Sequence, residues 1–437
     1  MWFDQSTIYQ IYPLGFCGVL DAERDPRRRS ILKVIDWIPH MQKLGVDAVL
    51  FNPLFDSDYH GYDTRNLFKV DERLGSNDDF RQVCAQLHEA GMKVILDGVF
   101  NHVGRGFWAF QDVREKQQHS AYKDWFYLDF QKQNRFQDGF SYQFWETADL
   151  LVKLNLKNPA VEEHLFNAIQ EWIHQYEIDG LRLDVAYLLE HSFLRNLRQK
   201  TSSWKADFLL LGELVAGDYK TWVNSEMLNS CTNYECYKGL FSSFNDLNLF
   251  EIAHSLNRQF ASAPYALYRN QRLMNFADNH DVDRIASRLS KKEHLQPLYA
   301  ILFGMPGVPC LYYGSEWGAT GKKTIHKDEE LRLSYDHPEW NTLTDLISQL
   351  IKIRKNEKAL LNGDYSQLAL NNQHFLFTRE YQQDKVIVGV NINQNPLEIK
   401  IPLHNELWKN LLTGEEMTVN GSVFMEPDSF AYWKKVS

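Results

Sequence analysis

The feature of this sequence that most constrains its fold is a unit of helix, turn and strand that recurs along the chain. Each copy has apolar residues at helical spacing, then a glycine or acidic turn, then a short run of branched apolar residues. The clearest copies comprise residues 31–38 before AVLF at 48–51, residues 80–87 before KVIL at 93–96, and residues 161–173 before GLRLDV at 180–185. Alternating helices and buried strands predict an α/β fold with a parallel sheet.

The number of strands selects between two parallel architectures. Strands are also predicted in FLLLGE, RLMNFAD and VPCLYYG, with helices over 247–260 and 343–353. About eight candidate strands therefore lie between Ile8 and Tyr313, which favours a (β/α)8 barrel over an open doubly wound sheet.

Two segments depart from the repeated unit. Residues 103–155 separate the third strand from its helix and are rich in aromatic side chains, which predicts a small inserted domain. After about residue 359 the pattern changes to alternating segments such as HFLFTREY and KVIVGVNI, which predicts a C-terminal antiparallel β-sandwich. The predicted domains are the barrel over 1–102 and 156–358, the insert over 103–155 and the sandwich over 359–437.

Composition and charge narrow the classes of partner. Of the 437 residues, 44% are hydrophobic and 24% charged, and no apolar run approaches the ~18 residues that span a bilayer, so no membrane partner is expected. The formal charge of −10 argues against a nucleic-acid partner, because phosphate binding needs clustered lysine and arginine. The N-terminal residues lack a secretory signal pattern, and the five cysteines form no CxxC pair. We therefore expect a cytoplasmic protein with reduced thiols and no zinc site.

Four of the candidate strands end in an acidic residue, at Asp97, Asp184, Glu213 and Asp281. In a (β/α)8 barrel the carboxyl ends of the strands meet at one face, where active sites lie. Any one such acid could be a solvated loop residue or a helix cap. The set, together with His102 and His280, predicts a single site at that face.

The segment DGLRLDVAYL at 179–188 places two opposite charges in an apolar strand. We expect Arg182 to lower the pKa of Asp184 and to keep Asp184 ionised as a nucleophile. We expect Glu213, close to other acids, to keep a proton near neutral pH and to act as an acid. A pair of this kind suits glycoside cleavage. Strand alternation predicts two faces, with Leu181, Leu183 and Val185 toward the helices and Arg182, Asp184 and Ala186 toward the barrel axis.

Four segments in this order resemble the signature segments of the alpha-amylase family, glycoside hydrolase family 13. They are DGVFNH at 97–102, GLRLDVA at 180–186, LGE ending at Glu213, and FADNHD at 276–281. HGYDTRN at 60–66 and PGVPCLYYGSEWG at 306–318 also resemble family segments, so the resemblance covers essentially the whole chain. LVKLNL at 151–156 is similar to the KLN form found in cyclomaltodextrinases, neopullulanases and maltogenic amylases.

The resemblance implies a retaining double displacement on an α-glucan, chiefly at α-1,4 bonds, with α-1,6 bonds as the second linkage and maltodextrins or cyclodextrins as substrates. It implies Asp184 as nucleophile, Glu213 as acid and base, and Asp281 as the residue that binds sugar hydroxyls and favours a distorted ring. It further implies substrate contacts by Tyr62, His102, Arg182 and His280, with Asp97 orienting neighbouring groups and Asn101 anchoring the insert. No outer sugar subsite is assigned to Trp108, Trp125 or Trp145, because the insert's aromatic side chains can form its own core or face the cleft.

The sequence departs from the family at several points. The aromatic residue that often follows the acid in the cyclomaltodextrinase branch is absent, since Leu214 directly follows Glu213 in GELVAGDY, and Ser315 stands where an acid is common, so leaving-group specificity is left open. The barrel begins almost at Met1, without the further N-terminal domain through which many cyclomaltodextrinases dimerise, and the choice between monomer and homo-oligomer is therefore open. The insert has no distinct cluster of acidic calcium ligands, so we expect no required cofactor or metal.

Other functions are weighed against this one. A metal-dependent hydrolase needs closely spaced ligands such as HxH, which the sequence lacks. GATGKKT at 318–324 contains the GK of a phosphate-binding loop, but Glu316 stands where the first glycine of that loop should be. A catalytically inactive barrel serving as a carbohydrate-binding or partner subunit should have lost one of the three acids, and all are present. A 4-α-glucanotransferase uses the same Asp184 and Glu213 with a sugar in place of water, and it stays an alternative.

Overall fold

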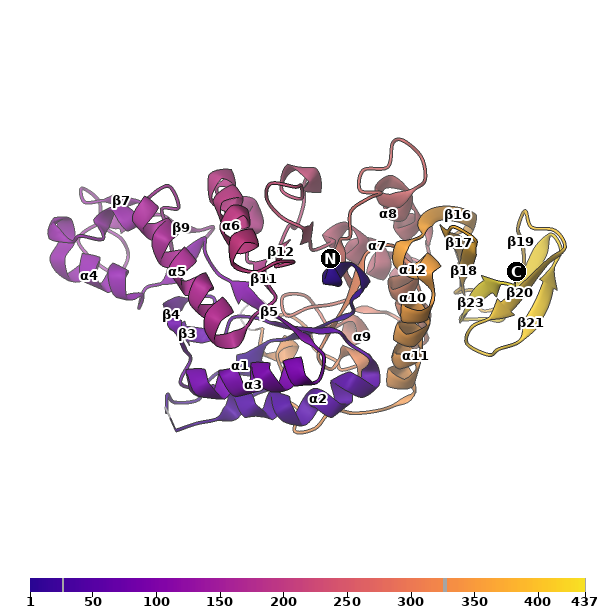
Figure 1. Cartoon of the computed structure of the whole chain (residues 1–437), viewed down its shortest axis with the longest axis horizontal. Helices are drawn as coiled ribbons and strands as arrows, with labels where there is room; N and C mark the ends of the chain where they lie inside the picture. Colours follow the sequence, from indigo (N-terminus) through magenta and orange to yellow (C-terminus); the bar gives the residue numbers. More distant parts are fainter. Residues whose placement is uncertain (26, 325–327, 437) are drawn as a thin grey trace.

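The computed structural model describes residues 1–25, 27–324 and 328–436, and a parallel eight-stranded barrel forms its centre (Figure 1). Each strand pairs in parallel with the next one along the chain, β15 pairs with β1, and a bridge between Thr232 and Met274 closes the circle. The predicted (β/α)8 barrel is confirmed. Its strands are β1 (Ile8–Ile11), β2 (Ala48–Phe51), β5 (Lys93–Gly98), β11 (Gly180–Leu183), β12 (Leu209–Gly212), β13 (Ser230–Cys231), β14 (Met274–Phe276) and β15 (Val308–Tyr312).

Because side chains alternate along a strand, the barrel wall has apolar side chains on its inner and its outer face. Leu50 and Ile95 belong to a cluster that fills the barrel interior, whereas Val49 and Val94, one residue before them, belong to the larger cluster between wall and helices. Both faces are therefore shielded from water, which explains why the sequences of these strands are continuous apolar runs. The surrounding helices are α2 (Lys33–Leu44), α3 (Asn77–Glu89), α5 (Pro159–Tyr176), α6 (His191–Trp204), α7 (Tyr234–Asn245), α8 (Phe250–Phe260), α10 (Leu295–Gly304) and α11 (Thr342–Asn356).

Local signals account for the helix ends. The Asn158 side chain accepts a hydrogen bond from the Ala160 N–H at the start of α5, with Pro159 at the first helical position. After α3, Gly91 has φ +82°, a left-handed conformation that glycine adopts without steric cost.

Two details of the barrel differ from the sequence pattern. β13 has two residues, too few to show any periodicity, and the sequence does not predict it. β11 ends at Leu183, earlier than expected, because Val185 turns into the left-handed region at φ +40°. Leu181 and Leu183 pack outward as predicted, but Ala186 joins this outer cluster too, so the predicted alternation is wrong beyond Asp184.

The insert leaves the barrel after β5. Its central sheet pairs β6 (His102–Gly104) with β10 (Ala148–Lys153), and β10 with β9 (Phe144–Trp145). The chain returns at Leu154, whose N–H donates to the Asn101 carbonyl oxygen at 3.0 Å. Other elements around it are α4 (Trp108–Lys116), the pair β7 (Leu128–Asp129) and β8 (Ser141–Tyr142), and the hairpin β3 (Phe55–Ser57) and β4 (Thr64–Val70).

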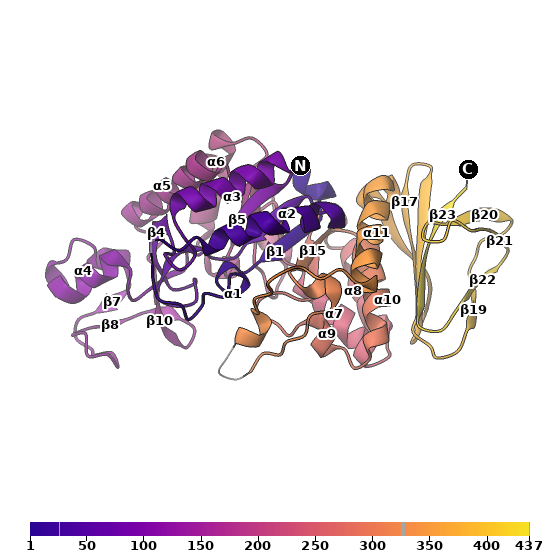
Figure 2. The same ribbon diagram turned by 90° about the horizontal axis from the view of Figure 1, so that it is seen from below.

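The C-terminal segment forms two antiparallel sheets around a common apolar core. It lies at the end of the molecule opposite the insert, with α10 and α11 between it and the barrel (Figures 1 and 2). Within the described residues, no helix is both long and apolar enough to cross a membrane. After α12 (Lys358–Asn362), the larger sheet has the order β16 (Asp364–Asn371), β17 (His374–Tyr381), β18 (Asp384–Asn391), β23 (Ser429–Lys435), β20 (Glu406–Asn410), β21 (Glu416–Val419), and the smaller one pairs β19 (Leu397–Lys400) with β22 (Ser422–Met425).

A histidine in an aromatic surround joins the insert to the barrel. The ring of His164, on α5, lies 5.5 Å from Trp108 and 5.3 Å from Trp125, both of the insert, and 5.4 Å from Phe68 of the barrel. Its Nε2 is buried without a hydrogen-bond partner in the described chain, and burial lowers the pKa of His164.

The burial of His164 predicts that the contact between the insert and the barrel weakens in acid. The pKa of His164 is lower in the folded than in the unfolded state, so the unfolded chain takes up more protons as the pH falls through about 6.5. The stability that the protein has with neutral His164 is therefore fully present above about pH 6.5 and is progressively lost as the pH falls below it. We expect His164→Gln to lose less stability than the wild type between pH 7.5 and pH 5.5 in urea unfolding. An equal loss in both proteins would contradict this expectation.

Candidate active site

Backbone pairing brings the ends of three neighbouring strands together. The register places Arg182 of β11 beside Asp97 of β5 and Leu183 beside Gly212 of β12. Beyond β12, the Glu213 N–H donates to the Leu183 carbonyl at 2.9 Å, and the Glu213 carbonyl accepts from the Ala186 N–H at 3.1 Å. The backbones on both sides of Asp184 and Glu213 are therefore tied to each other before any side chain interacts.

One buried guanidinium binds three of the predicted acids. Arg182 Nη1 donates to Asp97 at 2.7 Å and to Asp184 Oδ1 at 3.0 Å, and Nη2 lies 2.7 Å from Glu213 Oε1. All four side chains are less than 10% exposed. Burial of several carboxylates is tolerated only where a cation and hydrogen bonds compensate them, and the planar fork of arginine suits this task.

The nucleophile candidate Asp184 has one bound and one unbound oxygen. Oδ1 is held by Arg182, whereas the nearest polar atom recorded for Oδ2 within the described residues is His102 Nε2, at 4.0 Å. Burial raises the pKa of Asp184 well above its usual range, and the negative charges of Glu213 and Asp97 add to the effect against the attraction of Arg182. The expectation that Arg182 lowers this pKa is therefore wrong, because burial outweighs the ion pair. Asp184 and Glu213 contact the same guanidinium, so the charge on one acid affects the other.

The residue after Asp184 has a strained backbone. Val185 lies at φ +40° and ψ +47°, a left-handed conformation that a β-branched residue rarely adopts. In this conformation its N–H donates to Glu213 Oε2 at 3.0 Å. Strain of this kind persists where the surroundings impose it, commonly at active sites. The turn thus aims one more donor at Glu213.

Two substitutions separate this strain from the loss of the valine side chain. Val185→Ala and Val185→Gly both remove the buried isopropyl group, but only glycine adopts φ +40° freely. We expect the glycine variant to be more stable than the alanine variant by about 1 kcal/mol in chemical unfolding. In ordinary strand or helix positions alanine is the more stable of the two, so the usual order here would refute the strain.

Asp97 is enclosed by donors and has no free oxygen for a substrate. Besides Arg182, it accepts hydrogen bonds from Tyr62 Oη at 3.0 Å and from Asn52 Nδ2 at 3.1 Å. The Tyr62 ring lies parallel to the His280 imidazole, with centroids 5.6 Å apart, and Tyr62 Oη contacts His280 Nε2. The supporting role expected for Asp97 accordingly stays our proposal, and Tyr62 and His280 form one unit with it.

Asp281 lies on the other side of His280 and is the most exposed of the acids. Its side chain is 34% exposed, and its oxygens lie 2.9 Å from His280 Nε2 and 3.3 Å from Arg332 Nη2. Burial would raise the pKa of Asp281, but His280 and Arg332 outweigh burial and hold it below its usual range. Asp281 is therefore ionised at neutral pH.

His102 presents an unsatisfied donor to the site. Its Nδ1 contacts Asn101 Nδ2 at 3.2 Å, and its Nε2 is buried with no hydrogen-bond partner among the described residues. Burial lowers the pKa of His102 to about 3, so the imidazole is neutral. Trp145 of the insert lies against this ring at 5.9 Å, whereas Trp108 and Trp125 lie in the aromatic group around His164.

The structure adds residues to the site that the sequence analysis did not name. Asn52 directly follows β2, so the rule that located the acids at strand ends would also have found it. Tyr234 Oη approaches Glu213 Oε1 at 3.4 Å from the start of α7. Arg332 follows a loop after β15 and carries no periodic or motif signal. Only the tertiary fold places it against Asp281.

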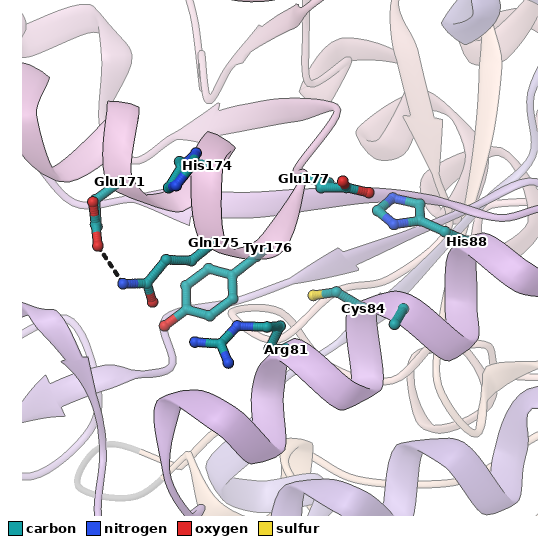
Figure 3. Close-up of a pocket in the computed structure, with 9 residues that line it drawn as sticks. Arg81, Cys84, His88, Glu171, His174, Gln175, Tyr176 and Glu177 are labelled. Carbon is teal, nitrogen blue, oxygen red and sulfur yellow. Dashed lines mark hydrogen bonds between the residues drawn. The ribbon is translucent and has the colours of Figure 1, made fainter.

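Surface hollows also occur away from the strand ends. One of about 630 Å³ lies between α3 and α5 on the outside of the barrel, with Arg81 and His88 facing Glu171 and His174 (Figure 3). None of the strand-end residues described in this subsection lines this hollow. Convergence of buried polar groups is the stronger criterion, since catalysis needs groups that act on one atom. Within the described ranges, no group of three or more His, Cys, Asp or Glu is arranged to hold a metal ion.

Chemically, the strand-end site combines three acids of different character. Asp184, whose pKa burial raises, and Glu213 contact the same guanidinium, and Asp281 is kept ionised nearby. Paired carboxyls whose surroundings separate their roles are the arrangement that cleaves glycosidic bonds.

Comparison with known proteins agrees with this chemistry. Residues 10–337 match the alpha amylase catalytic domain. The chain is 30% identical to a cyclomaltodextrinase of Geobacillus thermopakistaniensis and 31% identical to neopullulanase 2 of Thermoactinomyces vulgaris, each over 95% of this chain and 74% of the relative. The structure of a cyclic α-maltosyl-(1→6)-maltose hydrolase from Arthrobacter globiformis superposes over the full length of both chains, with a TM-score of 0.85 and 26% identity. The chain therefore belongs to the alpha-amylase family of glycoside hydrolases and is an α-glucan hydrolase.

Proposed function

We propose that this protein is a retaining hydrolase of malto-oligosaccharides or cyclodextrins that acts on α-1,4 bonds, with α-1,6 bonds as the second linkage. The observation that carries the proposal is the shared guanidinium of Arg182, whose two terminal nitrogens contact Asp184 and Glu213. Carboxyls that contact adjacent nitrogens of one group match the spacing of about 5 Å in retaining enzymes better than the wider spacing of inverting ones.

In the first step, Asp184 Oδ2 attacks the anomeric carbon of the bound sugar. The bond from that carbon to the glycosidic oxygen breaks, and Glu213 donates a proton to the departing oxygen. The step requires that Glu213 carries this proton and that Asp184 is ionised. The Val185 N–H and Tyr234 Oη next to Glu213 orient its carboxyl for the transfer.

In the second step, Glu213 removes a proton from water while the water oxygen attacks the anomeric carbon. The ester bond to Asp184 breaks, and both acids return to their starting protonation. Two inversions at one carbon give a product with the α-anomer of the substrate. Ionised Asp281 favours the positively charged, distorted sugar of both transition states.

The remaining groups bind the sugar. His102 Nε2, neutral and without a partner in the described chain, is a donor that a sugar hydroxyl would satisfy. The Tyr62 ring offers an apolar face for stacking, and Arg182 keeps Asp184 in place. Both ring nitrogens of His280 already have protein partners, Gln10 on Nδ1 and Tyr62 with Asp281 on Nε2, so sugar binding by His280 would compete with Asp281.

We further propose that the enzyme works in the cytoplasm on short glucans. Five thiols without a disulfide suit a reducing compartment. The printed names of the relatives support cyclic and branched α-glucans as candidate substrates beside linear ones.

Product analysis tests the proposal. Maltotriose, β-cyclodextrin, pullulan and soluble starch are incubated with the enzyme, and the anomers released first are followed by NMR, with Asp184→Asn as the blank for contaminating activity. We expect α-anomers and products no longer than the substrate. First release of β-anomers would refute retention, products longer than maltotriose would favour the 4-α-glucanotransferase, and no cleavage would refute the substrate class.

A further inference from the structure

A small hollow lies where the C-terminal domain meets the barrel, and none of the acids of the active site lines it. Its volume is about 130 Å³. One side of the hollow is formed by residues just before β14, namely Arg269, Asn270 and Arg272. The other side is formed by Asn362, at the end of α12, and Asp364, at the start of β16. The hollow thus lies between segments that belong to the two domains.

The lining has one compensated and one uncompensated arginine. Arg269 donates two hydrogen bonds to the Asp364 carboxylate, at 2.8 and 3.3 Å, so these charges cancel. The Arg272 guanidinium has neither a hydrogen bond nor an ion pair with any described residue, although it lines the hollow.

Two fully buried arginines lie directly behind the wall. Arg379 donates to the carbonyl of Gly363, which lines the hollow, and to that of Gly304 at 2.8 Å. Arg354 donates to the carbonyls of Phe303 and Gly307, and its Nε has no partner in the described structure. Both side chains are 2% exposed or less, and neither contacts a described carboxylate.

Carbonyl dipoles compensate these charges only in part. Gly304 and Phe303 are at the carboxyl end of α10, where the helix dipole is negative, but that end carries about half an elementary charge. Burial lowers the pKa of Arg354 to about 10 and that of Arg379 below its usual range, and the positive charge of Arg272 adds to both effects. Asp364 is the one negative side chain of the lining and it pairs with Arg269, so the arginines around the hollow leave it with a net positive potential.

We propose that this hollow is a binding site for an inorganic oxyanion of phosphate size. Arg272 is the direct ligand, and Arg354 and Arg379 attract the ion from behind the wall. The volume of the hollow is on the order of a few water molecules, which suits an ion with four oxygen atoms. A bound ion would tie the segment before β14 to the start of β16 and so stabilise the junction of the two domains. This proposal does not depend on the reaction at the strand ends.

Thermal unfolding in phosphate and in chloride at equal ionic strength tests the site. We expect saturating phosphate to raise the Tm of the wild type by about 3 °C over chloride, and Arg272→Gln to abolish the difference. Arg258→Gln removes an arginine that pairs with Glu235 outside the hollow, and it should keep the full difference, which controls for general salt effects.

A substitution that should increase the affinity for phosphate strengthens the test. Asp364→Asn removes the one negative side chain of the lining and frees Arg269, so it should bind phosphate about tenfold more tightly in isothermal titration. A phosphate effect that persists in Arg272→Gln, or weaker binding by Asp364→Asn, would overturn the proposal.

Discussion

Asp184→Asn is expected to lower kcat/KM on maltotriose or β-cyclodextrin by at least about 10⁴-fold without unfolding the protein. The amide keeps the shape of the side chain but cannot form the glycosyl ester. Because burial raises the pKa of Asp184, its charged form is costly in the folded protein. The neutral asparagine should therefore leave the Tm equal to that of the wild type or raise it, as expected where function requires a destabilising group.

The matched control is Asp283→Asn. Asp283 is close to Asp281 in the chain, but its carboxylate accepts a hydrogen bond from the Lys323 N–H at 2.7 Å and belongs to no part of the reaction. We expect this variant to retain activity within about twofold. Activity of Asp184→Asn above about 1% of the wild type, measured with no contaminating enzyme, would remove Asp184 from its role as nucleophile.

Arg182→Met is expected to lower both stability and activity, by about 3–5 kcal/mol of unfolding free energy and by at least about 10³-fold in kcat/KM. The change leaves Asp97, Asp184 and Glu213 buried without their cation. Without it, the pKa of Asp184, which burial already raises, rises further above that of the unfolded chain. The variant should therefore be closest to the wild type at low pH and should lose stability as the pH rises from 5 to 8.

Arg105→Met is the control for removing a partly buried arginine. Its partner Asp138 keeps a second cation, Arg114, at 3.0 Å, so a smaller loss with little dependence on pH is expected. Arg182→Lys provides the functional comparison if the methionine variant does not fold, because one ammonium group cannot contact three carboxyls in the same plane. It should fold and lose about 10²-fold in kcat/KM. Wild-type activity in the lysine variant would refute the bridging role of Arg182.

Sequence reasoning was effective where a feature depends on neighbours along the chain. The helix beginning at Asn158 and Pro159 has its signal within two residues. The acids at the ends of β5, β11 and β12 could be located because parallel strands in a barrel all present their carboxyl ends at one face. The same reasoning failed at Val185, since a left-handed turn in a β-branched residue is imposed by its surroundings and has no local signal.

The sequence by itself determined the barrel, the two added domains in outline and the candidate acids, because strand and helix periodicity and the positions of strand ends are local properties. Only the tertiary structure decided how these acids interact. It places Arg182 against three carboxyls, one of them 85 residues away in the chain, and Arg332 against Asp281. It also reversed the expected shift in the pKa of Asp184, because the cost of burying a charge depends on how much water the whole fold excludes.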